Sequence, residues 1–325
     1  MQDLFPIPSC FSSGEKLHDD PTSAVATRSG QGAVMLIYRT WIAGHCRLIT
    51  VTWCKNLLAH GLSVLVEGSD NNDEHKSNGN NSINVDSSSS SSNKHQNSCK
   101  VEMRPWNFWR KQGSKRFHVE GKPVDVYWDL KNAKFSDEPE PQSDYYVAVV
   151  SNDQVVLLLG DLKEDAFRRT GSRPSLIEAI LVSKKEHVFG KKRFSTRAKF
   201  HEEAKFHDIS IECNSSSSST NGGMDSEMVM KIDKHVAIHV RHLQWKFRGN
   251  ESISINKQRV QVYWDVHDWL FAPGLRHALF IFKPESLPSS SSSTSSSSYN
   301  NFAGSNANGG ESSGFCLFLY AWKLE

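Results

Sequence analysis

The chain has 325 residues and a formal net charge of +2 at pH 7. This length is typical of about two domains. Because the charges nearly balance, the composition argues against a strongly acidic or basic partner for the chain as a whole. Hydrophobic residues make up only 38% of the chain, but serine-rich runs account for much of the deficit. The remainder holds enough large apolar residues to build a folded core.

The cysteines and the N-terminal residues indicate where in the cell the protein is found. None of the six cysteines belongs to a C-x-x-C pair, which predicts reduced thiols and no zinc site. Residues 1–20 lack the basic start and the apolar stretch of a signal peptide. The longest apolar run, Phe315–Trp322, is too short to span a bilayer. We therefore expect an intracellular protein, cytoplasmic or nuclear and not secreted, without a transmembrane segment.

The first half of the chain is a succession of strand-like segments. Residues 1–32 are polar and predict a flexible N-terminal tail. Asn152-Asp153 predicts a tight hairpin turn, and Leu162–Arg169 predicts a short helix or turn. β-branched and aromatic residues recur in segments of strand length. The expected strands are Val34–Arg39, Arg47–Trp53, Leu62–Glu67, Cys99–Arg104, Lys115–Glu120, Val124–Leu130, Asp144–Ser151 and Gln154–Asp161.

The second half follows the same plan. Its hydrophobic pattern over 178–212 matches that of 33–67. Polar tracts at 68–98, 214–226 and 288–313 predict disordered loops, which cost little folding free energy. We expect an all-β fold with two related antiparallel halves, 33–170 and 171–325, that arose by internal duplication. The pattern leaves open two related β-sandwiches, two β-barrels or one larger pseudo-symmetric assembly.

One heptad occurs twice. Residues 124–130 are VDVYWDL and residues 260–266 are VQVYWDV, an offset of 136 residues. The same offset also relates Trp109 to Trp245 and Gly113 to Gly249. This predicts a repeated hairpin in which the paired tryptophans occupy equivalent places, with Trp128 and Trp264 mostly buried. The repeated residues singled out are Trp109, Tyr127, Trp128, Asp129, Trp245, Tyr263, Trp264 and Asp265.

The opposite faces of the heptad suggest different roles. Strand alternation places the valines and the tryptophan on one face and the aspartates and the tyrosine on the other. A paired Tyr/Asp site in each half is one interpretation. The alternative is that each aspartate caps the following turn and each tyrosine covers the sheet.

Several longer strings carry a resemblance to a known family. They include MRPWNFWRKQGSKRF, VDVYWDLKNAKF, EHVFGKKRFSTRAKF, VQVYWDVHDWLF and FCLFLYAWK. Together they resemble a plant-specific uncharacterised family, domain of unknown function 868, from about Ala33 to Trp322. The resemblance implies a plant protein and offers no catalytic residue, metal site or cofactor.

Two clusters of residues could bind ligands. His235, His239 and His242 could suggest a metal site, but strand alternation separates them, so surface or core histidines are the alternative. A basic segment with interleaved phenylalanines could bind nucleic acid or acidic lipid, or form the solvated face of a hairpin. Its basic residues are Lys184, Lys185, Lys191, Lys192, Arg193, Arg197 and Lys199.

The residues around Ser172 form the most specific short motif in the sequence, a candidate phosphorylation site. Arg168 and Arg169 precede it and Pro174 follows it, which suits a basophilic kinase and a phosphoserine-reading adaptor protein. The alternative is an ordinary basic connection between the halves.

Three functions remain open from the sequence. The first is a non-enzymatic β-rich binding or scaffold module, with phosphorylation of Ser172 as a candidate switch. The second is a carrier of a small apolar ligand or lipid inside a barrel. The third is an enzyme, which the absence of a nucleophile–base pattern disfavours. The sequence predicts no catalytic residue and no cofactor.

Overall fold

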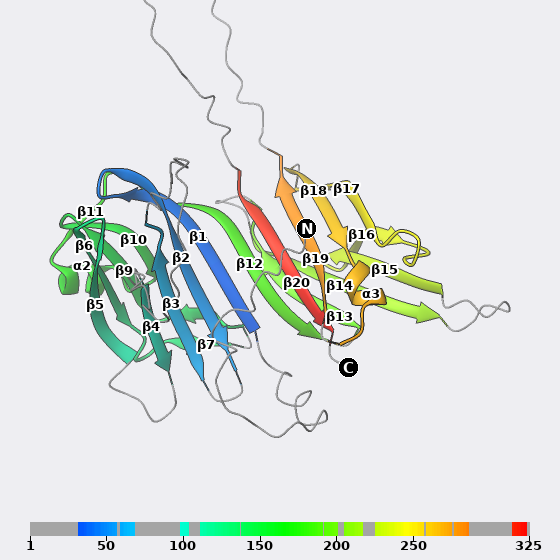
Figure 1. The fold of residues 1–325 in the computed structure, drawn as a ribbon, viewed down its shortest axis with the longest axis horizontal. Helices are drawn as coiled ribbons and strands as arrows, with labels where there is room; N and C mark the ends of the chain where they lie inside the picture. The colour runs from blue at the N-terminus through cyan, green and yellow to red at the C-terminus, as the bar shows by residue number, and fades with distance from the viewer. Residues whose placement is uncertain are drawn as a thin grey trace, which may run out of the picture. The chain divides into compact units, whose positions relative to one another are not determined.

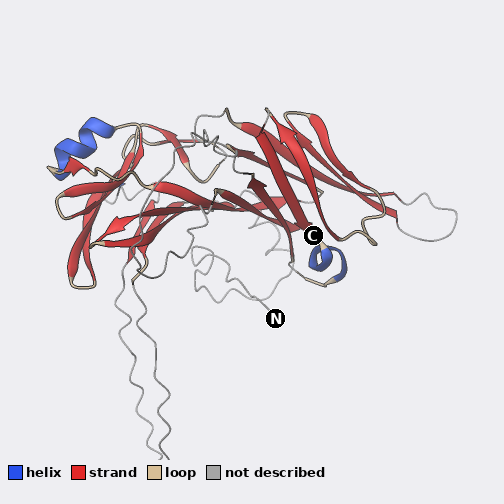
Figure 2. Cartoon of the chain, turned by 90° about the horizontal axis from the view of Figure 1, so that it is seen from above, coloured by secondary structure: helices blue, strands red, loops and turns tan. Residues whose placement is uncertain are grey.

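The computed structural model describes residues 32–56, 59–68, 98–103, 111–136, 138–190, 192–200, 205–216, 225–256, 258–274, 276–285 and 314–323. Residues 1–31 of the predicted N-terminal tail, residues 69–97 of the predicted loop 68–98 and the whole predicted loop 288–313 lie outside these ranges, whereas Gly32 begins a strand. Strands dominate the described chain and two short helices complete it (Figure 2), so the all-β prediction is confirmed. No helix among the described residues is long and apolar enough to cross a membrane.

The chain divides into two compact units by its internal contacts. Unit 1 comprises residues 1–37, 54–58 and 181–325, and unit 2 comprises residues 38–53 and 59–180. The first strand therefore contributes residues to both units. The domain boundaries proposed from the sequence, with a division after residue 170, stay a prediction.

Unit 2 is built from two main sheets (Figure 1). One has the order β1-β2-β3-β4 and the other β11-β10-β9-β6-β5, and a small β7-β8 pair accompanies them. The strands are β1 (Gly32–Ile42), β2 (His45–Lys55), β3 (His60–Val66), β4 (Ser98–Met103), β5 (Gln112–Val119), β6 (Lys122–Asp129), β7 (Lys134–Phe135), β8 (Pro141–Ser143), β9 (Tyr146–Ser151), β10 (Gln154–Gly160) and β11 (Arg173–Pro174). All eight strands expected in the first half are present.

A helix covers one face of the second sheet of unit 2. Helix α2 (Lys163–Thr170) buries Ala166 against Tyr146, Ala148 and Val150. The predicted helix is thus confirmed. Tyr127 packs against the same cluster.

Unit 1 is a two-layer sandwich. One sheet has the order β17-β18-β19-β20-β12, followed by β1, and the other β13-β14-β15-β16. Helix α3 (His267–Phe271) follows β18. The strands are β12 (Ile180–Gly190), β13 (Arg193–Ala198), β14 (His207–Ser216), β15 (Asp225–Ile232), β16 (His235–Val240), β17 (Arg248–Ile255), β18 (Gln258–Asp265), β19 (His277–Pro284) and β20 (Cys316–Lys323).

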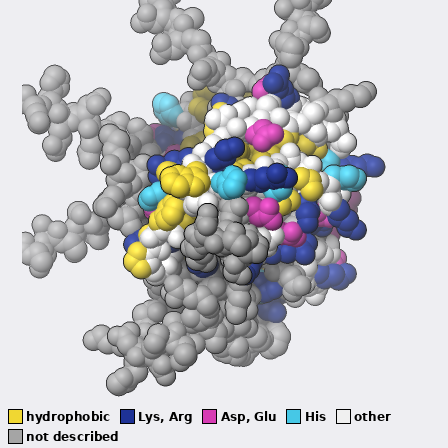
Figure 3. Space-filling view, turned by 90° about the vertical axis from the view of Figure 1, so that its right-hand side faces the viewer, with side chains coloured by type: hydrophobic (Ala, Val, Ile, Leu, Met, Phe, Trp, Pro, Cys, Tyr) yellow, Lys and Arg dark blue, Asp and Glu magenta, His cyan; other side chains and the backbone are white. Residues whose placement is uncertain are grey.

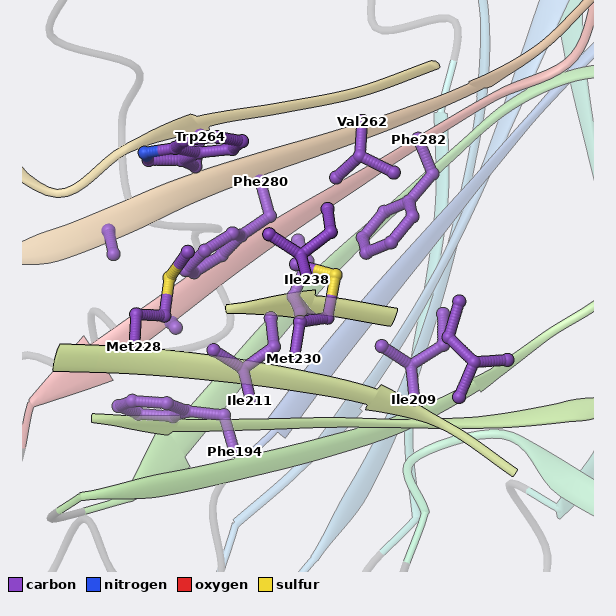
Figure 4. Close-up of a cluster of buried hydrophobic side chains, with 14 of the residues drawn as sticks. Phe194, Ile209, Ile211, Met228, Met230, Ile238, Val262, Trp264, Phe280 and Phe282 are labelled. Carbon is purple, nitrogen blue, oxygen red and sulfur yellow. The ribbon is translucent and has the colours of Figure 1, made fainter. Parts of the chain in front are cut away.

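Large apolar side chains fill the space between the two sheets of unit 1. Both sheets contribute them, because every second side chain of a strand points into the space between the sheets. Figure 4 shows them meeting across the interior. The labelled residues are Phe194, Ile209, Ile211, Met228, Met230, Ile238, Val262, Trp264, Phe280 and Phe282.

The structure corrects three expectations. Two pairings are parallel rather than antiparallel, β10 with β11 and β12 with β20. The loop predicted at 214–226 is too long at both ends, because β14 continues to Ser216 and pairs there with Asp225 of β15. Backbone pairing does not require apolar side chains, so the serines gave no sign of it. The prediction of six reduced thiols is wrong at Cys54, which is disulfide-bonded.

The repeated hairpins share one register. In β5–β6 Gly113 lies opposite Trp128, and in β17–β18 Gly249 lies opposite Trp264. Both tryptophans are buried, as expected. A Cβ atom on Gly113 would lie 2.7 Å from Cζ2 of Trp128, and one on Gly249 would lie 2.7 Å from Cε2 of Trp264. Each ring therefore needs a glycine beneath it. Duplication of the complete halves stays a prediction.

Candidate functional site

The most exposed tryptophan side chain among the described residues lies on the turn between β16 and β17. We call residues Arg241–Arg248 the aromatic turn; its sequence is RHLQWKFR. Trp245 is 80% exposed. Since tryptophan side chains are normally buried for most of their area, such exposure on a folded surface indicates a contact site.

Buried contacts on both sides hold this turn. Leu243 is fully buried and donates its backbone N–H to the carbonyl of Ser226 at 2.7 Å. The indole Nε1–H of Trp264 donates to the carbonyl of Lys246 at 3.1 Å. Within the turn, the N–H of Trp245 donates to the carbonyl of His242 at 2.9 Å. The exposed indole is therefore carried by backbone fixed to the core, which lowers the entropy lost when it binds.

Further aromatic side chains adjoin the turn. Phe247 meets His267 and Phe271 of α3, with ring centroids 5.1 and 5.9 Å apart. Phe271 is 53% exposed. On the side of unit 1 shown in Figure 3, hydrophobic side chains lie among histidine and basic side chains. Partly exposed aromatic rings therefore accompany Trp245.

The charges around the turn are mainly positive. Arg248 donates to Asp265 at 2.7 Å, a bond that raises the pKa of the guanidinium, and it lies over the Phe247 ring. The hydrogen bond from His267 lowers the pKa of Asp268. Both carboxylates thus have partners, whereas Arg241 and Lys246 are exposed and form no ion pair within the described part of the chain.

The repeated aspartates act as turn caps in both hairpins. Asp129 accepts the N–H of Lys131 at 3.1 Å and Asp265 that of His267 at 3.0 Å. Tyr127 packs under α2, whereas Tyr263 is 40% exposed. These contacts explain the repeated aspartates and tyrosines as structural residues, without a paired Tyr/Asp site. Trp109 lies outside the described residues, so its equivalence with Trp245 stays a prediction.

The predicted basic patch does not form one positive surface. Lys184 makes a buried ion pair with Glu186, which also accepts a hydrogen bond from Thr196. Arg193 pairs with Glu212 at 3.5 Å and Arg197 with Asp208 at 3.1 Å.

The remaining basic residues of the patch do not come together at one anion-binding site. Lys185 lies over Phe318 and Lys199 over Phe206, while Lys192 is exposed and Lys191 lies outside the described residues. Acids alternate with bases across β13 and β14, which argues against nucleic-acid binding at this patch.

Ser172 lies in the connection that follows α2. It is partly exposed, and its hydroxyl donates to the carbonyl of Thr170 at 3.3 Å. Gly171 ends the helix in the left-handed conformation. The arginines Arg168 and Arg169 form the last helical turn, so they are not extended alongside Ser172.

The three candidate metal ligands are not gathered. His239 pairs with Glu227 at 3.0 Å, His235 begins β16, and His242 lies in the aromatic turn. Among the described residues, no group of three histidine, cysteine or acidic side chains could hold a metal ion.

A pocket of about 390 Å³ opens at the β2–β3 edge of unit 2. Arg47 crosses its wall almost fully buried, ion-paired with Glu120 and donating to the carbonyl of Glu67 at 3.1 Å. The remaining lining residues are His45, Cys46, Leu48 and Gly68. Three of the lining residues, Arg47, Glu67 and Glu120, carry charged side chains, so the pocket does not resemble an apolar ligand cavity.

Comparison with known proteins identifies the family. A family model described as a plant protein of unknown function (DUF868) matches residues 29–323. The chain belongs to this family. No curated protein and no solved structure matches it.

The geometry of the DUF868 chain predicts slow phosphorylation of Ser172 in the folded protein. A basophilic kinase must reach Arg169 and Ser172 together, which requires the last turn of α2 to unwind. A free peptide spanning Ala166–Glu178 should therefore be phosphorylated about tenfold faster than the whole chain, since local opening has a free-energy cost. Kinase assays with Ser172→Ala as the control would measure this, and equal rates would show that the helix is no barrier.

A buried histidine of the DUF868 chain should make stability depend on pH. Burial lowers the pKa of His187 from 6.5 to about 4, and its Nδ1 accepts the indole N–H of Trp322 at 3.0 Å. The unfolded chain therefore takes up a proton at higher pH than the folded chain does. The contribution of His187 to the free energy of unfolding is fully present above pH 6.5. It is lost as the pH drops towards 4, by at most about 1.4 kcal/mol per pH unit.

Urea unfolding between pH 7 and pH 4 would measure the slope. His187→Gln is the matched variant, because its amide oxygen can accept the same hydrogen bond without titrating. Its stability should fall less over this range, and an unchanged slope would assign the loss to other groups.

Sequence reasoning missed the exposure of Trp245 in this DUF868 chain. The residue entered the prediction only as the repeat partner of Trp109, which does not indicate whether its side chain is exposed. One signal was available, because RHLQWKFR follows a strand, lacks period-two alternation and places basic residues on both sides of the aromatic ones.

Proposed function

We propose that this DUF868 protein is a non-enzymatic binding module that recognises its partner through the aromatic turn. The observation that carries this proposal is the 80% exposure of Trp245 on backbone fixed by Leu243 and Trp264. Tryptophan and arginine are enriched among residues that dominate binding energy. We place its action inside the cell, in the cytoplasm or nucleus.

The interiors favour this proposal over the carrier of a small apolar ligand. The space between the sheets of unit 1 is occupied by side chains (Figure 4). The pocket in unit 2 has the ion pair of Arg47 and Glu120 in its lining. A carrier would need an apolar cavity of ligand size.

Buried thiols also bear on the enzyme alternative. Burial raises the pKa of Cys99 to about 11 and that of Cys213 to about 12. At neutral pH these two thiols are almost wholly protonated and are weak nucleophiles. Neither of these two thiols is therefore a candidate nucleophile.

Phosphorylation of Ser172 remains a proposed switch of the binding module. Arg168, Arg169 and Arg173 lie close in sequence, and all three are exposed. A phosphate on Ser172 could accept bidentate hydrogen bonds from an arginine. An adaptor that reads Arg169 and phosphoserine together would also bind the unwound form of the helix end.

Affinity purification from plant tissue tests the proposed function. The wild type and Trp245→Ala would be compared, with lipid extraction of the same samples. Trp41→Ala is a matched control, because Trp41 is 49% exposed but belongs to unit 2. We expect at least one protein or lipid to be recovered with the wild type and Trp41→Ala but not with Trp245→Ala. Identical recovery with all three chains would contradict the proposal.

A further inference from the structure

We propose that the aromatic turn binds the surface of a membrane that contains anionic lipids. This inference rests on the proposed function and names the class of its partner. The turn would place the Trp245 indole among the lipid headgroups, with Phe271 beside it and basic side chains facing the lipid phosphates.

The exposed aromatic residues fit the interfacial region of a bilayer. The tryptophan side chain combines a large apolar ring with one N–H donor, which is why it favours the headgroup level. Trp245 is 80% and Phe271 53% exposed. The Phe247 ring joins the two segments, because it belongs to the turn and packs 5.9 Å from Phe271. Aromatic side chains from two segments can therefore enter one surface.

The charge of the turn is complementary to an anionic surface. Arg241, Lys246 and Arg248 occur within eight residues that contain no acid. Beside the turn, Asp265 is ion-paired with Arg248, and Asp268 accepts a hydrogen bond from His267. Basic residues near an anionic membrane contribute about 1 kcal/mol each to binding.

The backbone of the aromatic turn is fixed, so Trp245 is presented for insertion into lipid without a loop having to fold first. Leu243 is held in the core and the Trp264 indole donates to the carbonyl of Lys246, so the backbone on both sides of Trp245 is fixed. A single-stranded nucleic acid is the main alternative for basic residues beside aromatic ones. Its stacking platforms lie along a groove that tracks the strand, whereas a side chain as exposed as Trp245 projects from the surface.

Vesicle co-sedimentation tests this inference with the full chain. The probes are phosphatidylcholine vesicles with and without phosphatidylserine. We expect binding only to the anionic vesicles, and weaker binding as salt is added. Replacing Arg241 and Lys246 with glutamine should weaken binding about fivefold for each residue.

The tryptophan variants give the second arm of the test. Trp245→Ala should weaken vesicle binding about tenfold by removing its apolar surface, whereas Trp41→Ala should bind as the wild type does. Brominated lipids should quench part of the wild-type tryptophan fluorescence, and this quenching should be lost in Trp245→Ala. Thermal melts would verify that each variant is folded.

Three results would overturn the inference. They are no binding to anionic vesicles, equal binding by Trp245→Ala and wild type, or tight Trp245-dependent binding to a single-stranded oligonucleotide instead. If vesicles fail but a protein is still recovered in a Trp245-dependent manner, the lipid inference fails and the proposed function stands. If nothing binds in a Trp245-dependent manner, both fail.

Discussion

Trp264→Ala is expected to lower the free energy of unfolding by about 3–5 kcal/mol, the usual cost of truncating a buried tryptophan. The side chain is 8% exposed and lies among the core residues of unit 1. Its removal leaves a cavity over Gly249 and deprives the Lys246 carbonyl of its donor. Urea unfolding followed by circular dichroism would measure the change.

Trp245→Ala is the natural control for this measurement. Because Trp245 is 80% exposed, its removal should change stability by less than about 0.5 kcal/mol. Trp128→Ala, in the equivalent hairpin of unit 2, should resemble Trp264→Ala. A loss below about 1 kcal/mol for either buried tryptophan would contradict its role in the core.

Gly249→Ala is expected to destabilise the protein by about 1–3 kcal/mol, as overpacking of a core usually does. The new methyl group would lie 2.7 Å from Cε2 of Trp264, so the ring would have to move. Glu251→Ala, at an exposed position on the same strand, is the control and should have little effect.

A double variant separates this clash from a simple loss of backbone freedom. In a Trp264→Ala background, Gly249→Ala should cost almost nothing, because the ring that it meets is absent. An undiminished cost there would mean that the glycine serves the strand itself. Gly113→Ala with Trp128 should show the same coupling, and so would test the local equivalence of the two hairpins.

Local pattern in the sequence was sufficient to predict the strands. Alternation in β6 places Val124, Val126 and Trp128 on the buried face, as the structure shows. The Asn152-Asp153 turn also follows from residue type, and both residues have positive φ. Such features depend on residues within one strand or one turn, so a single sequence contains them.

Features that depend on distant partners could not be predicted. The parallel pairing of β12 with β20 joins Ser183 to Cys316, and no local pattern encodes which strand returns to which. The exposure of Trp245 depends on what packs around a turn, and the repeat by itself does not indicate it. The basic residues do not form one positive surface because acids on the neighbouring strand β14, such as Glu212, pair with some of them.

Fluorine NMR of the chain labelled with fluorotryptophan tests the binding proposal most directly. The Trp245 signal, assigned with Trp245→Ala, should respond strongly to a soluble paramagnetic agent in the free protein, since the ring is exposed. On addition of the partner or vesicle that the wild type binds, this signal should shift or broaden and lose that response. The signals of Trp128 and Trp264 should stay unchanged. A Trp245 signal that remains unchanged when the chain is saturated with its partner would contradict the aromatic turn as the binding site.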